Sequence, residues 1–338
     1  MLRWTGKLFL WTLAISVWIW CIACAASLDD NIPGWLGKTI TWSIGVGIPL
    51  ATFFFWKKRL VPALILTAAF VGLYVWLKCL QPTHERGWNL AQAKLPFAEV
   101  VESSSGESVE IKNIRAFRYG PVSPDHSPHY DDAYELAKLK RVWFGVDRFT
   151  TVEPLAHTFL SFEFEPGSHK TNFLAFSVET RREKNEKTYS PIRGFFNNYE
   201  IIYVIADEQD VLSVRSDVRE NVVQLYPVRA TKDQAIAMLK DMLERTNGIH
   251  KTPEFYNTMT NNCTNNIVYH TNKVLDEPIS AYQRGVVWPG YSDWLAYQLG
   301  IIDTDLPLNE ARERFRIDQR VKKWDGKSDF SEFIRGDE

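Results

Sequence analysis

Apolar residues dominate the first quarter of the chain, where they form three runs separated by polar or charged residues. The runs span residues 8–26, 39–56 and 60–77, and each has about eighteen or nineteen residues without a charge. A helix of that length crosses roughly 30 Å of hydrocarbon at about 1.5 Å per residue. The pattern therefore predicts three transmembrane helices that form a membrane anchor over residues 1–80.

Charged residues between the runs predict how this anchor is oriented. Arg3 and Lys7 precede the first run, residues 57–59 are basic, and Asp29 and Asp30 lie in the first loop. Because basic flanks stay on the cytoplasmic side, we expect a multi-pass membrane protein with a cytoplasmic N-terminus and a C-terminal domain in the periplasm or an equivalent outer compartment. A cleaved signal peptide is the alternative interpretation of the first run.

Beyond residue 80 the pattern changes to alternation and then to helical periodicity. We expect a juxtamembrane linker over residues 81–108, a domain over 109–322 and a charged tail over 323–338. Alternating apolar and polar positions predict strands, in the following ranges: 109–119, 143–149, 157–164, 172–182, 199–206 and 222–226. The helical section that follows gives an α+β fold class.

Two helix starts can be predicted in this helical section. Thr231 and Gln234 form a capping-box pattern, and the stripe behind them continues to Asn247. Asn262 is placed to cap a second helix whose first residue is Cys263, because the apolar periodicity begins after that cysteine.

Cys263 is the candidate nucleophile. The chain has four cysteines, and the other three, Cys21, Cys24 and Cys79, lie in the first 80 residues, so the exported part has one thiol and no disulfide framework. Its neighbours are polar, whereas a cysteine that acts as a small hydrophobe is expected among apolar residues. A position at a helix N-terminus favours the thiolate form.

A cysteine nucleophile needs a base and donors for an oxyanion. His157 is the candidate base, and Glu179, on the neighbouring strand of the same hairpin, is the candidate orienting group. The amides of Asn261 and Asn262 and the backbone near Thr264 are the candidate site support.

Composition excludes other classes of partner. The net charge is −2 and the basic residues form no stripe, which predicts no nucleic-acid binding. Residues 125–132 hold histidines and aspartates, but their spacing matches no strict metal site. We predict no metal and no cofactor.

Several separated motifs resemble the Lnb-type N-terminal periplasmic domain family over residues 115–305. They are the stretches 157–164, 177–181, 189–191, 255–257, 262–264 and 289–293. The resemblance implies a circularly permuted papain-like fold, similar to the NlpC/P60 superfamily, with histidine before cysteine. It implies Cys263 as nucleophile and His157 as base, with Glu179 as the candidate third residue.

The resemblance also implies a reaction. A named member of the family is a lipoprotein N-acyltransferase, which implies acyl transfer from a membrane phospholipid to a lipoprotein amine through a thioester on the enzyme. In that member the membrane helices follow the periplasmic domain, whereas here the apolar runs precede it. We therefore expect a cysteine-dependent acyltransferase or lipid acyl hydrolase. The alternatives are a cysteine peptidase or amidase acting on envelope peptides, and a non-catalytic envelope scaffold.

Overall fold

The structure, a computed structural model, describes residues 2–28, 34–55, 58, 60–103, 106–119, 128–186 and 189–336. The chain divides into two compact units. Unit 1 comprises Met1–Glu85, Glu186–Glu200 and Phe255–Thr258, and unit 2 comprises Arg86–Asn185, Ile201–Glu254 and Met259–Glu338. The charges expected in the loops of the anchor at Asp29, Asp30, Lys57 and Arg59 lie outside the described residues.

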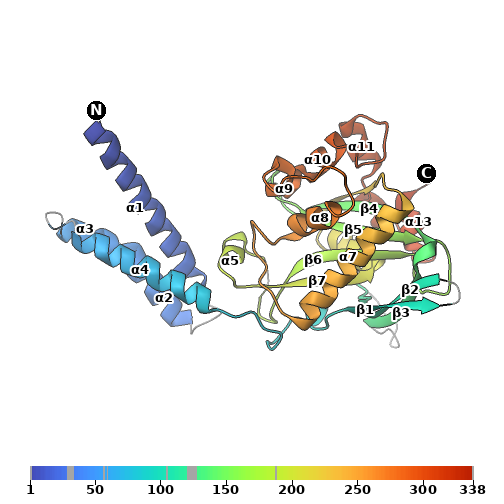
Figure 1. The fold of residues 1–338 in the computed structure, drawn as a ribbon, viewed down its shortest axis with the longest axis horizontal. Coiled ribbons are helices and arrows are strands. Elements are labelled where there is room, and N and C mark those ends of the chain that lie inside the picture. Colours follow the sequence, from blue (N-terminus) through green and yellow to red (C-terminus); the bar gives the residue numbers. More distant parts are fainter. Residues whose placement is uncertain are drawn as a thin grey trace. The chain divides into compact units, whose positions relative to one another are not determined.

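Unit 1 contains the apolar runs as helices (Figure 1). In chain order these are α1 (Leu2–Ala26), α2 (Gly34–Trp42), a π-helical turn (Ser43–Gly47), α3 (Ile48–Phe54) and α4 (Leu60–Cys79). Within the described residues, α4 is the helix whose length and composition suffice to cross a membrane, and Trp11–Ala26 forms a shorter apolar helix. The second expected span is interrupted by the π-helical turn. The number of spans therefore stays a prediction.

The helices of unit 1 pack through apolar side chains and one indole. Cys21 and Cys24 of α1 are buried in a cluster with Ile44 and Ile48. Trp18 donates its indole N–H to the carbonyl oxygen of Ile44 at 3.0 Å. Both thiols are packed as small hydrophobic side chains, so they contribute to the apolar interior of unit 1.

Unit 2 is built on an eight-stranded sheet in the order β1-β2-β7-β6-β5-β4-β8, with β3 paired to β2. The strands are β1 (Phe97–Ser103), β2 (Gly106–Arg115), β3 (His129–Glu135), β4 (Leu139–Arg148), β5 (His157–Phe164), β6 (Phe173–Arg181), β7 (Glu200–Asp207) and β8 (Val222–Pro227). The six predicted strands are present with shifted ends. β1 and β3 fall in stretches that we expected to be linker and loop.

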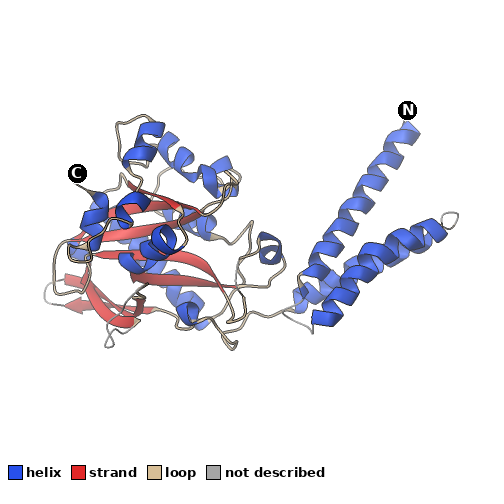
Figure 2. Ribbon diagram, turned by 180° about the vertical axis from the view of Figure 1, so that it is seen from behind, coloured by secondary structure: helices blue, strands red, loops and turns tan. Residues whose placement is uncertain are grey.

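Helices cover both faces of this sheet, and strand alternation decides which side chains meet them. On one face, α6 (Glu208–Ser213), α12 (Asp318–Val321) and α13 (Phe330–Arg335) belong to a core cluster with Phe159 and Val204. On the other face lie α7 (Lys232–Lys251) and α8 (Cys263–Thr271), which Figure 1 shows in front of the sheet. Figure 2 gives the opposite view, from the side of the first face. We call these the α6 face and the α8 face.

The helical section agrees with its predicted starts. α7 begins after Thr231, whose hydroxyl accepts from the backbone N–H of Gln234 in a capping box. It continues beyond Asn247 to Lys251, because Gly248 is tolerated inside a helix whose buried stripe extends to Ile249.

The remaining helices are α9 (Arg284–Val287), α10 (Ser292–Gln298) and α11 (Leu308–Arg314), together with α5 (Pro191–Phe195) in unit 1. In the expected tail, Phe330 and Ile334 of α13 are buried in the α6-face cluster.

Candidate functional site

Cys263 is the first residue of α8 and is buried, with 4% of its surface exposed. Asn262 caps the helix: its side-chain oxygen accepts from the backbone N–H of Asn265 at 2.9 Å, and the side chain of Asn265 accepts from the N–H of Asn262 at 3.2 Å. This confirms the predicted cap. The capping box holds the first turn in place, so the thiol sits at the positive end of the helix dipole.

The asparagines next to Cys263 take part in a structural network. Asn266 donates its side-chain amide to the side-chain oxygen of Asn261 at 2.9 Å and to the carbonyl oxygen of Asn262 at 2.8 Å. Tyr203 of β7 donates its hydroxyl to the side-chain oxygen of Asn266 at 2.8 Å. These bonds fix the loop before the thiol to the sheet. An oxyanion role for Asn261 or Asn262 stays a prediction.

A pair of threonines joins α8 to β5. The hydroxyls of Thr158 and Thr264 lie 3.0 Å apart, and both side chains are buried. The Cys263 sulfur lies 3.9 Å from the Thr264 hydroxyl oxygen. Because Thr158 follows His157 and Thr264 follows Cys263, this contact brings the start of β5 next to the start of α8.

His157 is linked to Glu179 through Ser177. The imidazole Nε2 lies 2.8 Å from the Ser177 hydroxyl oxygen, and that hydroxyl lies 2.9 Å from Oε1 of Glu179. The pairing of Phe159 with Ser177 sets this arrangement, because it places these side chains on the same face of the sheet. The predicted histidine and carboxylate are thus brought together, with a serine between them.

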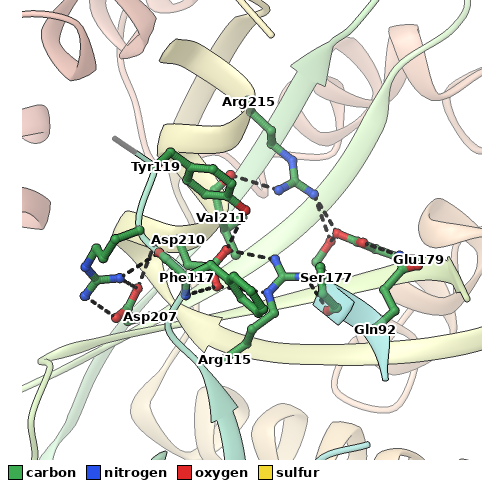
Figure 3. Close-up of polar contacts among 12 residues, drawn as sticks. Gln92, Arg115, Phe117, Tyr119, Ser177, Glu179, Asp207, Asp210, Val211 and Arg215 are labelled. Carbon is green, nitrogen blue, oxygen red and sulfur yellow. Dashed lines mark hydrogen bonds and ion pairs between the residues drawn. The ribbon is translucent and has the colours of Figure 1, made fainter. Parts of the chain in front are cut away.

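Arg215, in the π-helical segment Val214–Val218 after α6, holds this chain of contacts from the α6 face (Figure 3). One guanidinium nitrogen donates to Ser177 at 3.1 Å and to Glu179 at 3.0 Å. Another forms an ion pair with one carboxylate oxygen of Asp147 at 3.2 Å, and the other oxygen of Asp147 accepts from the side-chain amide of Asn221. The guanidinium is buried and faces two carboxylates, as a buried charge requires.

These contacts fix the tautomer of His157. A serine hydroxyl has one proton and two lone pairs, and a guanidinium can only donate. Since Glu179 is ionised and only accepts, Ser177 gives it the proton and accepts from Arg215. The remaining lone pair of Ser177 must then accept from the imidazole, so His157 carries its proton on Nε2 and the lone pair on Nδ1. Among the described residues, Nδ1 has no hydrogen-bond partner.

The charge states agree with this assignment. Burial lowers the pKa of His157 to about 3, and the Arg215 charge acts in the same direction. Burial raises the pKa of Glu179, but Arg215 and Arg115 outweigh it and hold that pKa below its ordinary value. At neutral pH the imidazole is therefore neutral and the carboxylate is charged. A neutral imidazole with a free Nδ1 lone pair is in the form of a base.

The imidazole and the thiol are not joined directly in this conformation. No hydrogen bond between them occurs in the described part of the chain. His157 precedes Thr158 on β5, and successive residues of a strand point to opposite faces. The Thr158 side chain meets α8, whereas the imidazole bonds to Ser177 on the α6 face. His157 is the first residue of β5. For Cys263 and His157 to act as a pair, the sulfur and the imidazole would therefore have to meet around the beginning of this strand.

A wider polar network supports the carboxylates of the α6 face (Figure 3). Arg115 of β2 makes two hydrogen bonds to Asp210 of α6, at 2.9 and 3.0 Å. Gln92 donates to Oε2 of Glu179 at 3.1 Å and to the carbonyl oxygen of Thr180 at 2.9 Å. Gln92 lies in the stretch expected to be a linker, and here it holds the candidate orienting group.

Comparison with known proteins places one segment of the chain in a family. Residues 126–289 match the family model described as the Lnb N-terminal periplasmic domain. This segment belongs to that family. The match includes His157, Glu179 and Cys263, and it ends close to the start of α10. No curated protein and no solved structure matches the chain. Membership of the Lnb N-terminal periplasmic domain family indicates a membrane-associated protein of the cell envelope.

The histidine and aspartate stretch at residues 125–132 is only partly visible. Asp125, His126 and Ser127 lie outside the described residues. Within the described residues no group of three or more histidine, cysteine or carboxylate side chains is placed to hold a metal ion.

Sequence reasoning missed three residues of this candidate site. Arg215 gave no signal, because it lies in a charged stretch whose place on the sheet depends on the packing of α6. Asp147 is buried at the end of β4, where a solvated charge would be expected. Ser177 lies two residues before Glu179 in the predicted strand 172–182, but its place between His157 and Glu179 depends on the register of β5 and β6.

Proposed function

We propose that this protein is a membrane-anchored, cysteine-dependent acyltransferase or lipid acyl hydrolase that acts through an acyl-thioester on Cys263. The observation that carries the proposal is the contact between Thr158 and Thr264, which brings the start of the Cys263 helix to the start of the His157 strand. The thiol lies at the start of a capped helix. The imidazole, hydrogen-bonded through Nε2 and free at Nδ1, belongs to the residue that precedes Thr158. These are two of the three parts that thiol chemistry needs.

The reaction follows from these parts. The Cys263 sulfur attacks an ester carbonyl carbon of a phospholipid while Nδ1 of His157 takes the thiol proton. The carbon–oxygen bond to the leaving alcohol then breaks, and His157 returns the proton to that alcohol, which leaves an acyl-thioester and a lyso-phospholipid. An amine or water next attacks the thioester and regenerates the thiol. In this proposal, backbone N–H groups at the start of α8 stabilise the oxyanion.

The finer assignment extends to topology, fold and acceptor. We propose three membrane spans, with the N-terminus in the cytoplasm and unit 2 in the periplasm, and a permuted papain-like arrangement of unit 2. The order of histidine before cysteine and the packing of a cysteine helix on an antiparallel hairpin support this fold. A lipoprotein amine is the proposed acceptor, as the resemblance to the family matched over residues 126–289 implies. A membrane anchor gives the site a high local concentration of lipid.

The test is to incubate the full-length protein with phospholipid vesicles and to measure two products by mass spectrometry. We expect lyso-phospholipid, and Cys263 with the added mass of a fatty acyl chain. Cys263→Ala should remove both products, and Cys79→Ala, which changes the exposed cysteine of unit 1, should remove neither. Peptide fragments released from envelope peptides, without lyso-phospholipid, would identify a peptidase. A Cys263 that forms no adduct with either substrate would identify a scaffold.

A further inference from the structure

A cavity of about 90 Å³ lies on the α8 face, between the sheet and the helices α7 to α10. At about 10–15 Å³ for each water-sized group it has room for roughly six to nine such groups. Its walls are mainly aliphatic, with Leu160, Met238, Val286 and Leu295 among them. Cavities with aliphatic walls bind apolar ligands.

One wall of the cavity is a stripe along α8. Thr264, Ile267, Val268 and Thr271 line it, and the spacing i, i+3, i+4, i+7 places them on one side of the helix. The stripe covers two turns, about 10 Å. Thr264 lines the cavity and its hydroxyl oxygen lies 3.9 Å from the Cys263 sulfur, so the Thr264 end of the stripe is next to the thiol.

One polar group in the cavity wall, the hydroxyl of Ser292, is unpaired within the described part of the chain. The Ser292 hydroxyl oxygen is buried and has no hydrogen-bond partner among the described residues, although Ser292 lines the cavity. By contrast, the Thr271 hydroxyl donates to the carbonyl oxygen of Ile267, and the Gln234 amide donates to that of Val274. An unpaired buried hydroxyl is unfavourable, so the Ser292 hydroxyl is available to hydrogen-bond a ligand in the cavity.

Ser292 lies at the thiol end of the cavity. The backbone N–H of Gly290, two residues earlier, donates to the carbonyl oxygen of Pro154 at 2.9 Å, and Pro154 lies three residues before His157. Gly290 is required for this contact, since a Cβ there would lie 1.8 Å from the carbonyl oxygen of Glu153. The Ser292 hydroxyl and Thr264 thus lie at the same end of the cavity, where β5 and α8 begin.

We propose that this cavity binds the hydrocarbon chain of the ester that Cys263 attacks, with the ester oxygens at the Ser292 hydroxyl and the chain along α8. The inference rests on the proposed function. A linear fatty acyl chain fits because it is apolar along its length and has hydrogen-bonding atoms at one end only. A peptide carries an amide at every residue, and the aliphatic walls would leave most of these amides without partners.

The test uses a photoreactive fatty acid, which carries a diazirine on its chain, with the full-length Cys263→Ala protein in lipid nanodiscs. Peptide mapping should find the label on residues of α7, α8 and α10. Ala235→Phe, which fills the cavity from α7, should lower labelling of these helices at least tenfold. Ala237→Phe is the matched control, because Ala237 lies two residues away on the exposed side of α7, and it should leave the labelling unchanged.

Two outcomes would overturn the proposal. The first is label confined to the helices of unit 1, and the second is cavity labelling that Ala235→Phe does not lower. Both outcomes are independent of the thioester, which is measured in the wild type. A missing adduct on Cys263 contradicts the proposed chemistry, even when labelling shows that the cavity binds the chain.

Ser292→Ala tests the hydroxyl separately, and it avoids the risk that a bulky side chain unfolds the protein. It should lower cavity labelling several-fold and keep or raise the melting temperature, because it removes an unpaired polar group. A lower melting temperature with unchanged labelling would show that the hydroxyl has a structural role and would overturn its assignment to the ester.

Discussion

The two faces of the sheet in unit 2 are held together by different interactions. On the α6 face, buried charges meet at Arg215, which contacts Asp147, Ser177 and Glu179 and orients His157. On the α8 face, aliphatic residues surround a cavity that begins beside Cys263. The two faces therefore have different roles. The α6 face fixes the protonation state of the proposed base, and the α8 face leaves space for an apolar ligand.

Removing the cation at the centre of the α6 face is the most damaging change. Arg215→Ala leaves the buried Asp147 and the partly buried Glu179 without their main cationic partner, and we expect a loss of about 3–5 kcal/mol in the free energy of unfolding. Arg229→Ala is the matched control, since its ion pair with Asp303 is more than half exposed, and it should cost less than about 1 kcal/mol. Denaturant titration measures both. Equal losses in the two variants would contradict a special role for the α6 face.

Ser177→Ala separates orientation from stability. Without the hydroxyl, Nε2 of His157 loses its acceptor, so we expect a mixture of imidazole tautomers and thioester formation slower by about tenfold to a hundredfold, as for a lost buried hydrogen bond of about 1–3 kcal/mol. The ¹⁵N chemical shifts of the imidazole report the tautomer. Ser161→Ala is the control, because Ser161 is buried on the same face of β5. Ser177→Thr should restore the wild-type shifts. An unchanged tautomer in Ser177→Ala would refute the hydrogen-bond assignment.

Acid should destabilise the α6 face through His157. Its pKa is lowered to about 3 in the folded protein, whereas an unfolded chain takes up a proton near pH 6.5. The unfolded state therefore binds more protons between these values, and stability falls as the pH drops from about 6.5 toward 3. Between pH 7 and pH 5, we expect the free energy of unfolding of His157→Gln to fall by about 1–2 kcal/mol less than that of the wild type. Parallel stability curves would show that the imidazole titrates normally.

The sequence could predict those parts of unit 2 that depend on local signals. The capped start of α8, the capping box of α7 and the alternation of β5 and β6 all depend on neighbouring residues, and they are found as expected. The resemblance to the Lnb-type family is likewise confirmed by the match over residues 126–289.

Other parts depend on long-range packing, which leaves no local pattern. β1 and β3 are held by pairing with β2, and Arg215 reaches Glu179 because α6 packs on β6. Alternation along the predicted strand 157–164 puts His157, Phe159, Ser161 and Glu163 on one face. Which helix covers that face is set by the tertiary fold, so the sequence did not reveal that α8 lies against Thr158 instead.

The most direct test of the account is whether the side chain at position 157 reaches Cys263 in solution. Three full-length variants, each with Cys21, Cys24 and Cys79 replaced by serine, carry a new cysteine at position 157, 158 or 161. A disulfide forms only between cysteines whose Cα atoms approach to about 4.4–6.8 Å with suitable directions. After mild oxidation, mass spectrometry should find His157→Cys linked to Cys263 and Ser161→Cys unlinked. Cross-linking of Thr158→Cys without any in His157→Cys would contradict the proposed pair of base and nucleophile.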